Sequence, residues 1–134
     1  MSQENVATVE AALAAAARGG FDAFSEYLSD DIDYRAVEGA LDDRGPMHGK
    51  DAVRAYLQDW LDLFDDFKAE PVELIDAGED QVIAVVRISG RAKLSGVETD
   101  LTFAVVNTIR DGKIVRGREY WTKEQALEAA GLSE

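Results

Sequence analysis

The sequence predicts an α+β fold in which a curved, mostly antiparallel sheet packs against helices and encloses an apolar pocket. Apolar residues recur at helical spacing in the first half of the chain, whereas from Lys68 onward most of them recur with a period of two, as in strands. Short turns separate those later strands, and short turns make neighbouring strands antiparallel. Helices first and most strands afterwards is the α+β pattern. With 134 residues, the chain is expected to form one domain over residues 1–134.

The N-terminal segment carries two helical patterns separated by a pair of glycines. The first pattern consists of apolar residues at helical spacing, namely Val6, Val9, Leu13 and Ala16. Gly19 and Gly20 are expected to end this helix, because glycine commonly terminates helices. A short second helix places three apolar residues on one face, namely Phe21, Phe24 and Leu28, before Asp30 and Asp31 end it.

A strand, a loop and a long helix follow. Ile32–Val37 alternates between apolar and polar residues, as a strand does. Glu38–Gly49 is rich in Gly and Asp and contains Pro46, a composition typical of a loop. The next segment is the clearest helix, with apolar residues at i, i+3, i+4, i+7, i+8 and i+11, namely Val53, Tyr56, Leu57, Trp60, Leu61 and Phe64.

Four strands and a final helix complete the chain. The strands are expected at Lys68–Asp76, Gln81–Lys93, Glu98–Arg110 and Lys113–Trp121. Asp111-Gly112 between the last two is a strong hairpin signal. The final helix is expected to begin at Thr122, which has capping-box spacing to Gln125, and to end at Gly131. All helices are expected to lie across one face of the sheet.

Alternation along each strand predicts which side chains face the helices. In the last strand the more apolar set contains Val115, Gly117, Glu119 and Trp121. Glu119 is therefore expected among apolar neighbours, an unusual place for a carboxylate. The corresponding sets in the other strands are Leu101, Phe103, Val105 and Asn107, then Ile83, Val85, Arg87 and Ser89, then Ile32, Tyr34 and Ala36. If these sets line one cavity, Arg87, Glu119 and Tyr34 converge inside it.

Two interpretations of this convergence stay open. A buried carboxylate needs a partner, and Arg87 is the natural one for Glu119. The two residues are either a structural ion pair or part of a catalytic site that perturbs pKa values. The side chains expected to line the pocket are Trp60, Phe64, Ser89, Leu101, Phe103, Val105, Asn107 and Trp121. The aromatic ones fit an ordinary core equally well.

The opposite face of the middle strands is apolar too. It is expected to carry Val82, Ala84, Val86, Ile88, Ala104 and Val106. A sheet face open to water is normally more polar, so something is expected to cover this one. A second copy of the chain is the simplest cover, which predicts a homodimer formed through the outer face of the sheet.

Composition excludes several classes of partner. The net charge of −13 disfavours nucleic acid and anionic membranes, since phosphate groups require Lys and Arg. Without cysteine there is no disulfide, thiolate zinc site or cysteine nucleophile. The N-terminal residues lack the basic start and apolar run of a secretory signal, and no apolar run approaches the roughly 20 residues that span a bilayer. Cytoplasmic residence is therefore expected.

Motifs for metals and cofactors are not apparent. No cluster of His, Asp and Glu has metal-ligand spacing, and no glycine motif is suited to cradle a phosphate. Neither a metal nor a cofactor is expected. His48 is the single histidine; it is interpreted as a turn residue at the rim of the pocket, with a catalytic role as the alternative.

The chain resembles the nuclear transport factor 2-like superfamily, and within it the SnoaL-like branch. The resemblance rests on the order of elements and on three segments, namely His48-Gly49-Lys50-Asp51-Ala52-Val53, Asp111-Gly112-Lys113-Ile114, and Arg118-Glu119-Tyr120-Trp121 leading to Ala126-Leu127. It covers nearly the whole chain and implies a cystatin-like cone. The superfamily contains isomerases, cyclases, hydrolases, dehydratases and non-catalytic binders, so the resemblance does not determine the reaction.

Limonene-epoxide hydrolases are similar in the strand that contains Glu119. The resemblance implies that Glu119 corresponds to the aspartate that acts on water as a base, Arg87 to the central arginine, and Tyr34 to the water-holding tyrosine. The acid that protonates the epoxide is replaced by Ser89, and the asparagine that helps to hold the water by Ala36. A serine hydroxyl is far too weak an acid for that role, which argues against epoxide hydrolysis by the family mechanism.

Two functional hypotheses follow from the other relatives. Polyketide cyclases of the SnoaL type have an acid–base aspartate where this chain has Thr122, and ketosteroid isomerases are similar in fold alone. The first hypothesis is a cofactor-independent enzyme acting on a neutral, apolar small molecule, with Glu119 as base, Arg87 orienting it, and Tyr34 holding water or a substrate oxygen. The second is a binding protein that uses the same pocket without turnover.

Overall fold

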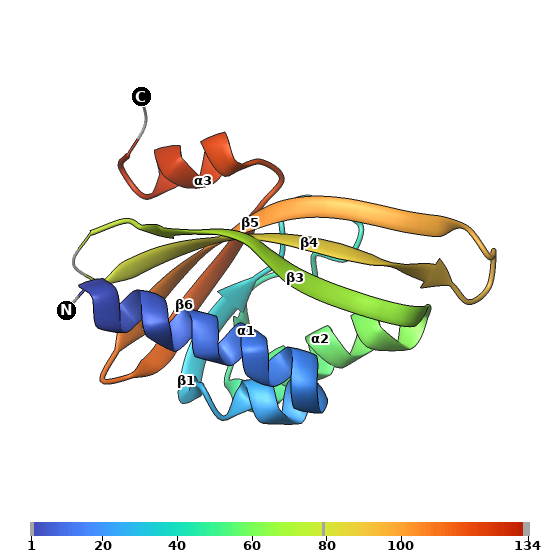
Figure 1. The fold of residues 1–134 in the computed structure, drawn as a ribbon, viewed down its shortest axis with the longest axis horizontal. Helices are drawn as coiled ribbons and strands as arrows, with labels where there is room; N and C mark the ends of the chain where they lie inside the picture. The colour runs from blue at the N-terminus through green and yellow to red at the C-terminus, as the bar shows by residue number, and fades with distance from the viewer. Residues whose placement is uncertain (1, 79, 133–134) are drawn as a thin grey trace.

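A computed structural model describes residues 2–78 and 80–132 and confirms the α+β architecture (Figure 1). The elements follow in the order α1 (Ser2–Ser25), β1 (Leu28–Arg35), β2 (Met47–His48), α2 (Lys50–Leu63), β3 (Phe64–Asp76), β4 (Gln81–Ala92), β5 (Glu98–Arg110), β6 (Lys113–Tyr120) and α3 (Lys123–Ala129). None of the helices in these described ranges has the length and apolar character needed to cross a bilayer.

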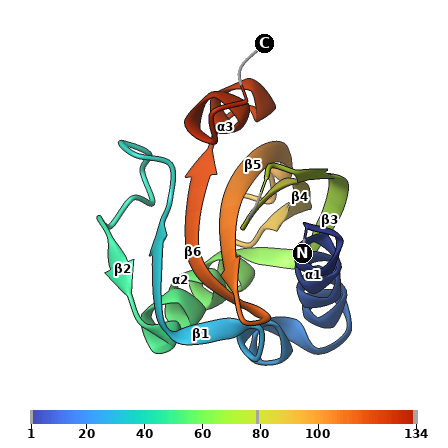
Figure 2. The ribbon, with the colours of Figure 1, turned by 90° about the vertical axis from the view of Figure 1, so that its left-hand side faces the viewer.

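The strands form one curved sheet in the order β2-β1-β6-β5-β4-β3. Every neighbouring pair is antiparallel except β1 and β6, which run parallel. Figure 2 shows how strongly β5 and β6 bend, so that the sheet has a concave and a convex face. Helices α1 and α2 lie on the concave side, whereas α3 lies on the convex side (Figure 1).

Several element boundaries differ from the expected ones. The break predicted at Gly20 is present as a kink with φ 75° and ψ −166°, which divides α1 into two helical parts. Leu28 begins β1 instead of ending a helix. Met47 is buried and pairs with Tyr34, so β2 forms inside the segment expected to be a loop. Strand β3 begins directly after α2, at Phe64 rather than Lys68.

The face expected for β4 is wrong. Val86 pairs with Phe103 and Ala84 with Val105, so the even-numbered residues of β4 share the concave face with the odd-numbered residues of β5. The register across the β4–β5 turn determines this relation, and a shift of one residue exchanges the two faces. Arg87 therefore lies on the convex face of the sheet, whereas alternation along the strand had placed it on the face toward the cavity.

The convex face is covered by the chain itself. Ile83, Val85, Ala104 and Val106 pack with Ala126 of α3, and Leu127 and Ala130 contact the same cluster. The expectation that every helix lies on one face is thus wrong for α3. Of the residues that motivated a homodimer, Ala104 and Val106 are covered by α3 within the chain. Val82, Ala84, Val86 and Ile88 belong to the core on the concave side instead, and the dimer itself stays a prediction.

Candidate functional site

A cavity of about 740 Å³ lies between the concave face of the sheet and helices α1 and α2. Its walls are mainly apolar side chains from α1, α2, β4 and β5. The stacked rings of Trp60 and Phe64 add an aromatic surface, with centroids 5.8 Å apart. Of the residues expected here, seven line the cavity, namely Trp60, Phe64, Leu101, Phe103, Val105, Asn107 and Trp121. Ser89 does not, because it shares the convex face with Arg87.

Glu119 is positioned on the wall of this cavity by β6, which pairs it with Val105 of β5. Tyr34 Oη donates a hydrogen bond to Glu119 Oε2 at 2.6 Å, and Tyr56 Oη lies 3.0 Å from Glu119 Oε1. Burial raises the pKa of Glu119 to about 7, although both tyrosine hydroxyls act in the opposite direction. The site thus contains a carboxyl group that titrates near neutrality.

Tyr34 reaches Glu119 because Gly117 leaves room for its ring. Tyr34 and Gly117 are partners in the parallel pairing of β1 with β6, and Tyr34 is buried. A Cβ atom at position 117 would lie 2.5 Å from two carbons of the Tyr34 ring, closer than van der Waals contact allows. Burial, followed by the charge of Glu119, raises the pKa of Tyr34 well above its usual value, so its hydroxyl keeps its proton and acts as a donor.

Asp42 and Tyr56 belong to the site and were missed in the sequence. Asp42 Oδ2 lies 3.0 Å from Tyr56 Oη and accepts a hydrogen bond from Trp60 Nε1, also at 3.0 Å. Tyr56 and Trp60 are four residues apart on α2 and therefore project from the same side of the helix. A tyrosine hydroxyl in a buried apolar stripe signals a need for a polar partner, but the sequence does not show which residue supplies it.

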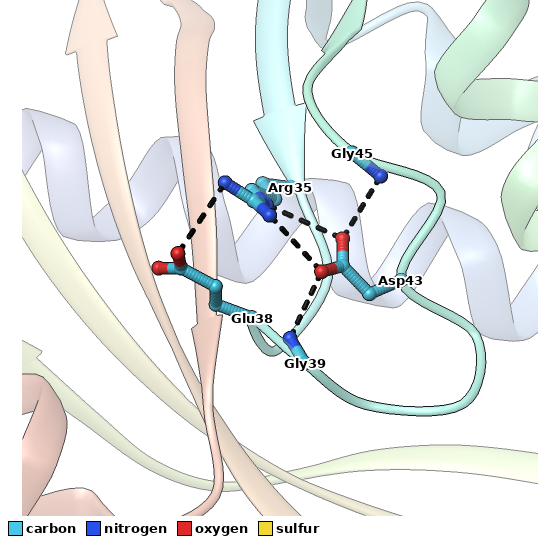
Figure 3. A network of polar contacts seen from close by, with 5 residues as sticks. All are labelled: Arg35, Glu38, Gly39, Asp43 and Gly45. Atoms are coloured by element: carbon cyan, nitrogen blue, oxygen red, sulfur yellow. Dashed lines mark hydrogen bonds and ion pairs between the residues drawn. The ribbon is translucent and has the colours of Figure 1, made fainter.

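The loop that carries Asp42 is held by its neighbour Asp43 (Figure 3). Asp43 accepts hydrogen bonds from Arg35 Nε and Nη2 at 3.2 and 3.0 Å and from the backbone amides of Gly39 and Gly45, both at 2.9 Å. The Arg35 hydrogen bonds, reinforced by these amides, hold the pKa of Asp43 far below its usual value. The same arginine lies 3.8 Å from Glu38, so one cation on β1 contacts two carboxylates of this loop.

Arg87 does not join this site. Its side chain is exposed on the convex face, and its Nε donates to Asp100 Oδ1 at 2.8 Å. The predicted pairing of Arg87 with Glu119 is therefore wrong. The hydroxyl groups of Tyr34 and Tyr56 are the hydrogen-bond partners of the two Glu119 carboxyl oxygens instead. His48 is also outside the cavity wall: it is exposed, and its Nδ1 lies 2.7 Å from Asp33 Oδ1, a contact that raises its pKa.

Among the described residues, no three His, Cys, Asp or Glu side chains come together as ligands for a metal ion. The polar centre of the cavity instead consists of two carboxyl groups and two phenols, with Tyr56 between Asp42 and Glu119. This arrangement can bind and move protons.

Comparisons with known proteins agree with this fold. A family model described as "SnoaL-like domain" matches residues 9–117. A nuclear transport factor 2-like protein from Burkholderia pseudomallei is 19% identical, with a TM-score of 0.75 over 93% of this chain and 95% of that one. The Mycobacterium tuberculosis protein Rv0760c, solved with estradiol-17β-hemisuccinate, is 13% identical, with a TM-score of 0.73 over 90% and 95%. A candidate SnoaL-like polyketide cyclase from Mesorhizobium loti is 22% identical, with a TM-score of 0.65 over 85% and 96%. No curated protein matches the chain.

Proposed function

The chain belongs to the SnoaL-like family of the nuclear transport factor 2-like superfamily, and on that premise we propose that its cavity binds an apolar small molecule to which Glu119 transfers a proton. One observation carries this proposal. A carboxyl group with a pKa near 7 lies in the wall of a large apolar cavity, held by two phenolic hydroxyls. A general acid or base is most effective when its pKa is close to the working pH.

The chemistry we propose is cofactor-independent proton transfer of the isomerase or cyclase type. Ionised Glu119 accepts a proton from an acidic C–H bond of a bound carbonyl compound, and neutral Glu119 returns it to another atom. Tyr34 orients the carboxyl group, a role different from the water-holding one inferred from the hydrolases. A cavity of about 740 Å³ is large enough for a ligand of several rings. The steroid ligand of the M. tuberculosis relative directs the search to fused-ring compounds. The acidic C–H bond that the proposed chemistry needs narrows it to ketones, so fused-ring ketones are the first compounds to test.

A non-catalytic binding protein is the second candidate. The observation that favours it is that both Glu119 oxygens already have tyrosine hydroxyls as partners. Such a pair of hydrogen bonds would satisfy a buried carboxyl group without any turnover.

Proton exchange distinguishes the two candidates. Fused-ring ketones that raise the melting temperature of the protein are incubated with it in D2O, and NMR measures deuterium uptake at their acidic carbons. An enzyme should accelerate uptake, and Glu119→Gln should lower the rate on the order of 10²-fold or more while the affinity changes little. Glu128→Gln, the same change at an exposed residue of α3, is the control. Binding without accelerated exchange supports the non-catalytic candidate, and full activity of Glu119→Gln rejects the role of Glu119.

A further inference from the structure

Tyr56 lies between two carboxyl groups and has one proton to offer. Its Oη is 3.0 Å from Glu119 Oε1 and 3.0 Å from Asp42 Oδ2, so both distances are those of hydrogen bonds. A phenol has a single O–H and can donate to one acceptor at a time. If both carboxyl groups were ionised, Tyr56 Oη could donate to only one of them, and its lone pair would face a lone pair of the other carboxylate. A second proton must therefore lie on one of the carboxyl groups.

We infer that Asp42 and Glu119 share this proton through Tyr56, so that Asp42 acts as a proton store for Glu119. In one state, neutral Glu119 donates to Tyr56 Oη and Tyr56 donates to Asp42. In the other state, neutral Asp42 donates to Tyr56 Oη and Tyr56 donates to Glu119. The two states differ in the direction of the two hydrogen bonds at Tyr56. In each state both contacts consist of one donor and one acceptor.

The groups around the chain of hydrogen bonds supply donors but little positive charge. Tyr34 on β1 donates to Glu119, and Trp60 on α2 donates to Asp42. Arg44 brings a cation close to Tyr56, with its guanidinium 5.2 Å from the centre of the Tyr56 ring. Arg44 is itself paired with Asp59 at 2.9 Å, so it offers little charge to the two carboxyl groups. The charge of Asp42 also contributes to the raised pKa of Glu119.

The consequence for catalysis rests on the proposed function. When Asp42 holds the proton, Glu119 is ionised and can take a proton from a substrate C–H bond, whose electron pair stays on carbon. Asp42 then releases its own proton to water, because it is only half-buried and adjoins the fully exposed Leu41. The O–H bond of Tyr56 turns toward Asp42, and the chain of hydrogen bonds again holds one shared proton, now on Glu119. The reverse sequence delivers a proton to the substrate.

Titration of the two carboxyl groups tests the inference without any substrate. NMR follows the side-chain carboxyl carbons of selectively labelled Glu and Asp in the parent and in variants with intact folds. In the parent, Asp42 and Glu119 should each show two steps, at the same two pH values, because coupled groups titrate as a pair. In Asp42→Asn, Glu119 should titrate in a single step, at a pH lower by about one unit or more than its upper step in the parent. In Glu119→Gln, Asp42 should likewise titrate in a single step.

Two further variants complete the design. Asp62→Asn removes an exposed carboxylate on the same helix as Tyr56 and outside the chain of hydrogen bonds, and it should leave both two-step titrations unchanged. Tyr56→Phe should weaken the coupling; if it does not fold, the reciprocal changes at positions 42 and 119 decide the question. Single, independent steps for the two residues in the parent would overturn the inference. Coupled titration without proton exchange on any ketone would reject the proposed function and leave the shared proton in place.

Discussion

Glu119→Gln should change how the stability of the protein depends on pH. Burial raises the pKa of Glu119 from an ordinary 4.5 to about 7, so the folded chain holds this proton more tightly than the unfolded chain does. The stability contributed by the neutral carboxyl group is fully present below about pH 4.5. It is lost as the pH rises through about 7, since the ionised form is then disfavoured in the folded protein.

The size of the effect follows from the same shift. Each unit of pKa difference corresponds to about 1.4 kcal/mol, so a difference of about 2.5 units amounts to roughly 3 kcal/mol at pH 8. Glutamine has the same shape and no titration. Its amide oxygen can accept from Tyr34, and its amide nitrogen can donate to Tyr56, which then donates to Asp42. The variant should therefore become more stable relative to the parent, by roughly 3 kcal/mol, between pH 4.5 and pH 8.

Urea denaturation at half-unit steps from pH 4.5 to pH 8 measures this difference. Titrating groups outside the Asp42–Tyr56–Glu119 chain of hydrogen bonds are common to both proteins and cancel. Glu128→Gln supplies the same chemical change at an exposed site. A stability difference between Glu119→Gln and the parent that stays constant over this range would refute the raised pKa. The proposed acid–base role would lose its physical basis with it.

Three other changes test the geometry around the cavity. Gly117→Ala should destabilise the protein by about 1–3 kcal/mol in thermal denaturation, because its Cβ would collide with the Tyr34 ring 2.5 Å away; unchanged stability would mean that Tyr34 moves aside freely. Arg35→Ala should increase amide hydrogen exchange across residues 38–46, since Asp43 loses its side-chain anchor; unchanged exchange there would show that the backbone contacts suffice. Trp60→Phe keeps an aromatic ring, so it should weaken binding of an apolar ligand less than Trp60→Ala does in calorimetry; equal losses would place the indole outside the binding surface.

The elements of the fold could be predicted because their signals are local. The apolar stripe of α2 and the Asp111-Gly112 turn each depend on a few adjacent residues, and both features are present. The kink at Gly20 was also visible as a glycine pair. Strand β2 was not, because two residues become a strand only through pairing with β1, which depends on the rest of the fold.

The prediction of which β4 side chains face the cavity was wrong for a physical reason. Its concave side faces the cavity and its convex side faces α3, so both alternating sets of residues are mainly apolar. Alternation then has little contrast between the two faces, and only the register with β5 determines which set lies inside. Arg87 and Ser89 were placed in the site by this error together with the resemblance to limonene-epoxide hydrolases, whereas Glu119 and Tyr34 do lie on the cavity wall.

The site residues that were missed depend on contacts between distant segments. Tyr56 lies within an apolar helix stripe, where a tyrosine is ordinarily part of the core, and its hydroxyl meets Asp42 and Glu119 from elsewhere in the chain. Asp42 is one of two consecutive aspartates in a loop. Nothing in the sequence distinguishes it from Asp43, whose partner is Arg35 and whose role is to hold the loop.

The replacement of an arginine by two phenols as partners of Glu119 changes the chemistry that the site favours. A neighbouring guanidinium would lower the pKa of the carboxyl group and keep it ionised at neutral pH, which suits a base that activates water. Phenols donate hydrogen bonds without supplying a positive charge, so burial dominates and the pKa rises to about 7. At that value the ionised and neutral forms are both populated near neutrality. The same residue can then take a proton and return it, as the proposed reversible proton transfer on carbon requires.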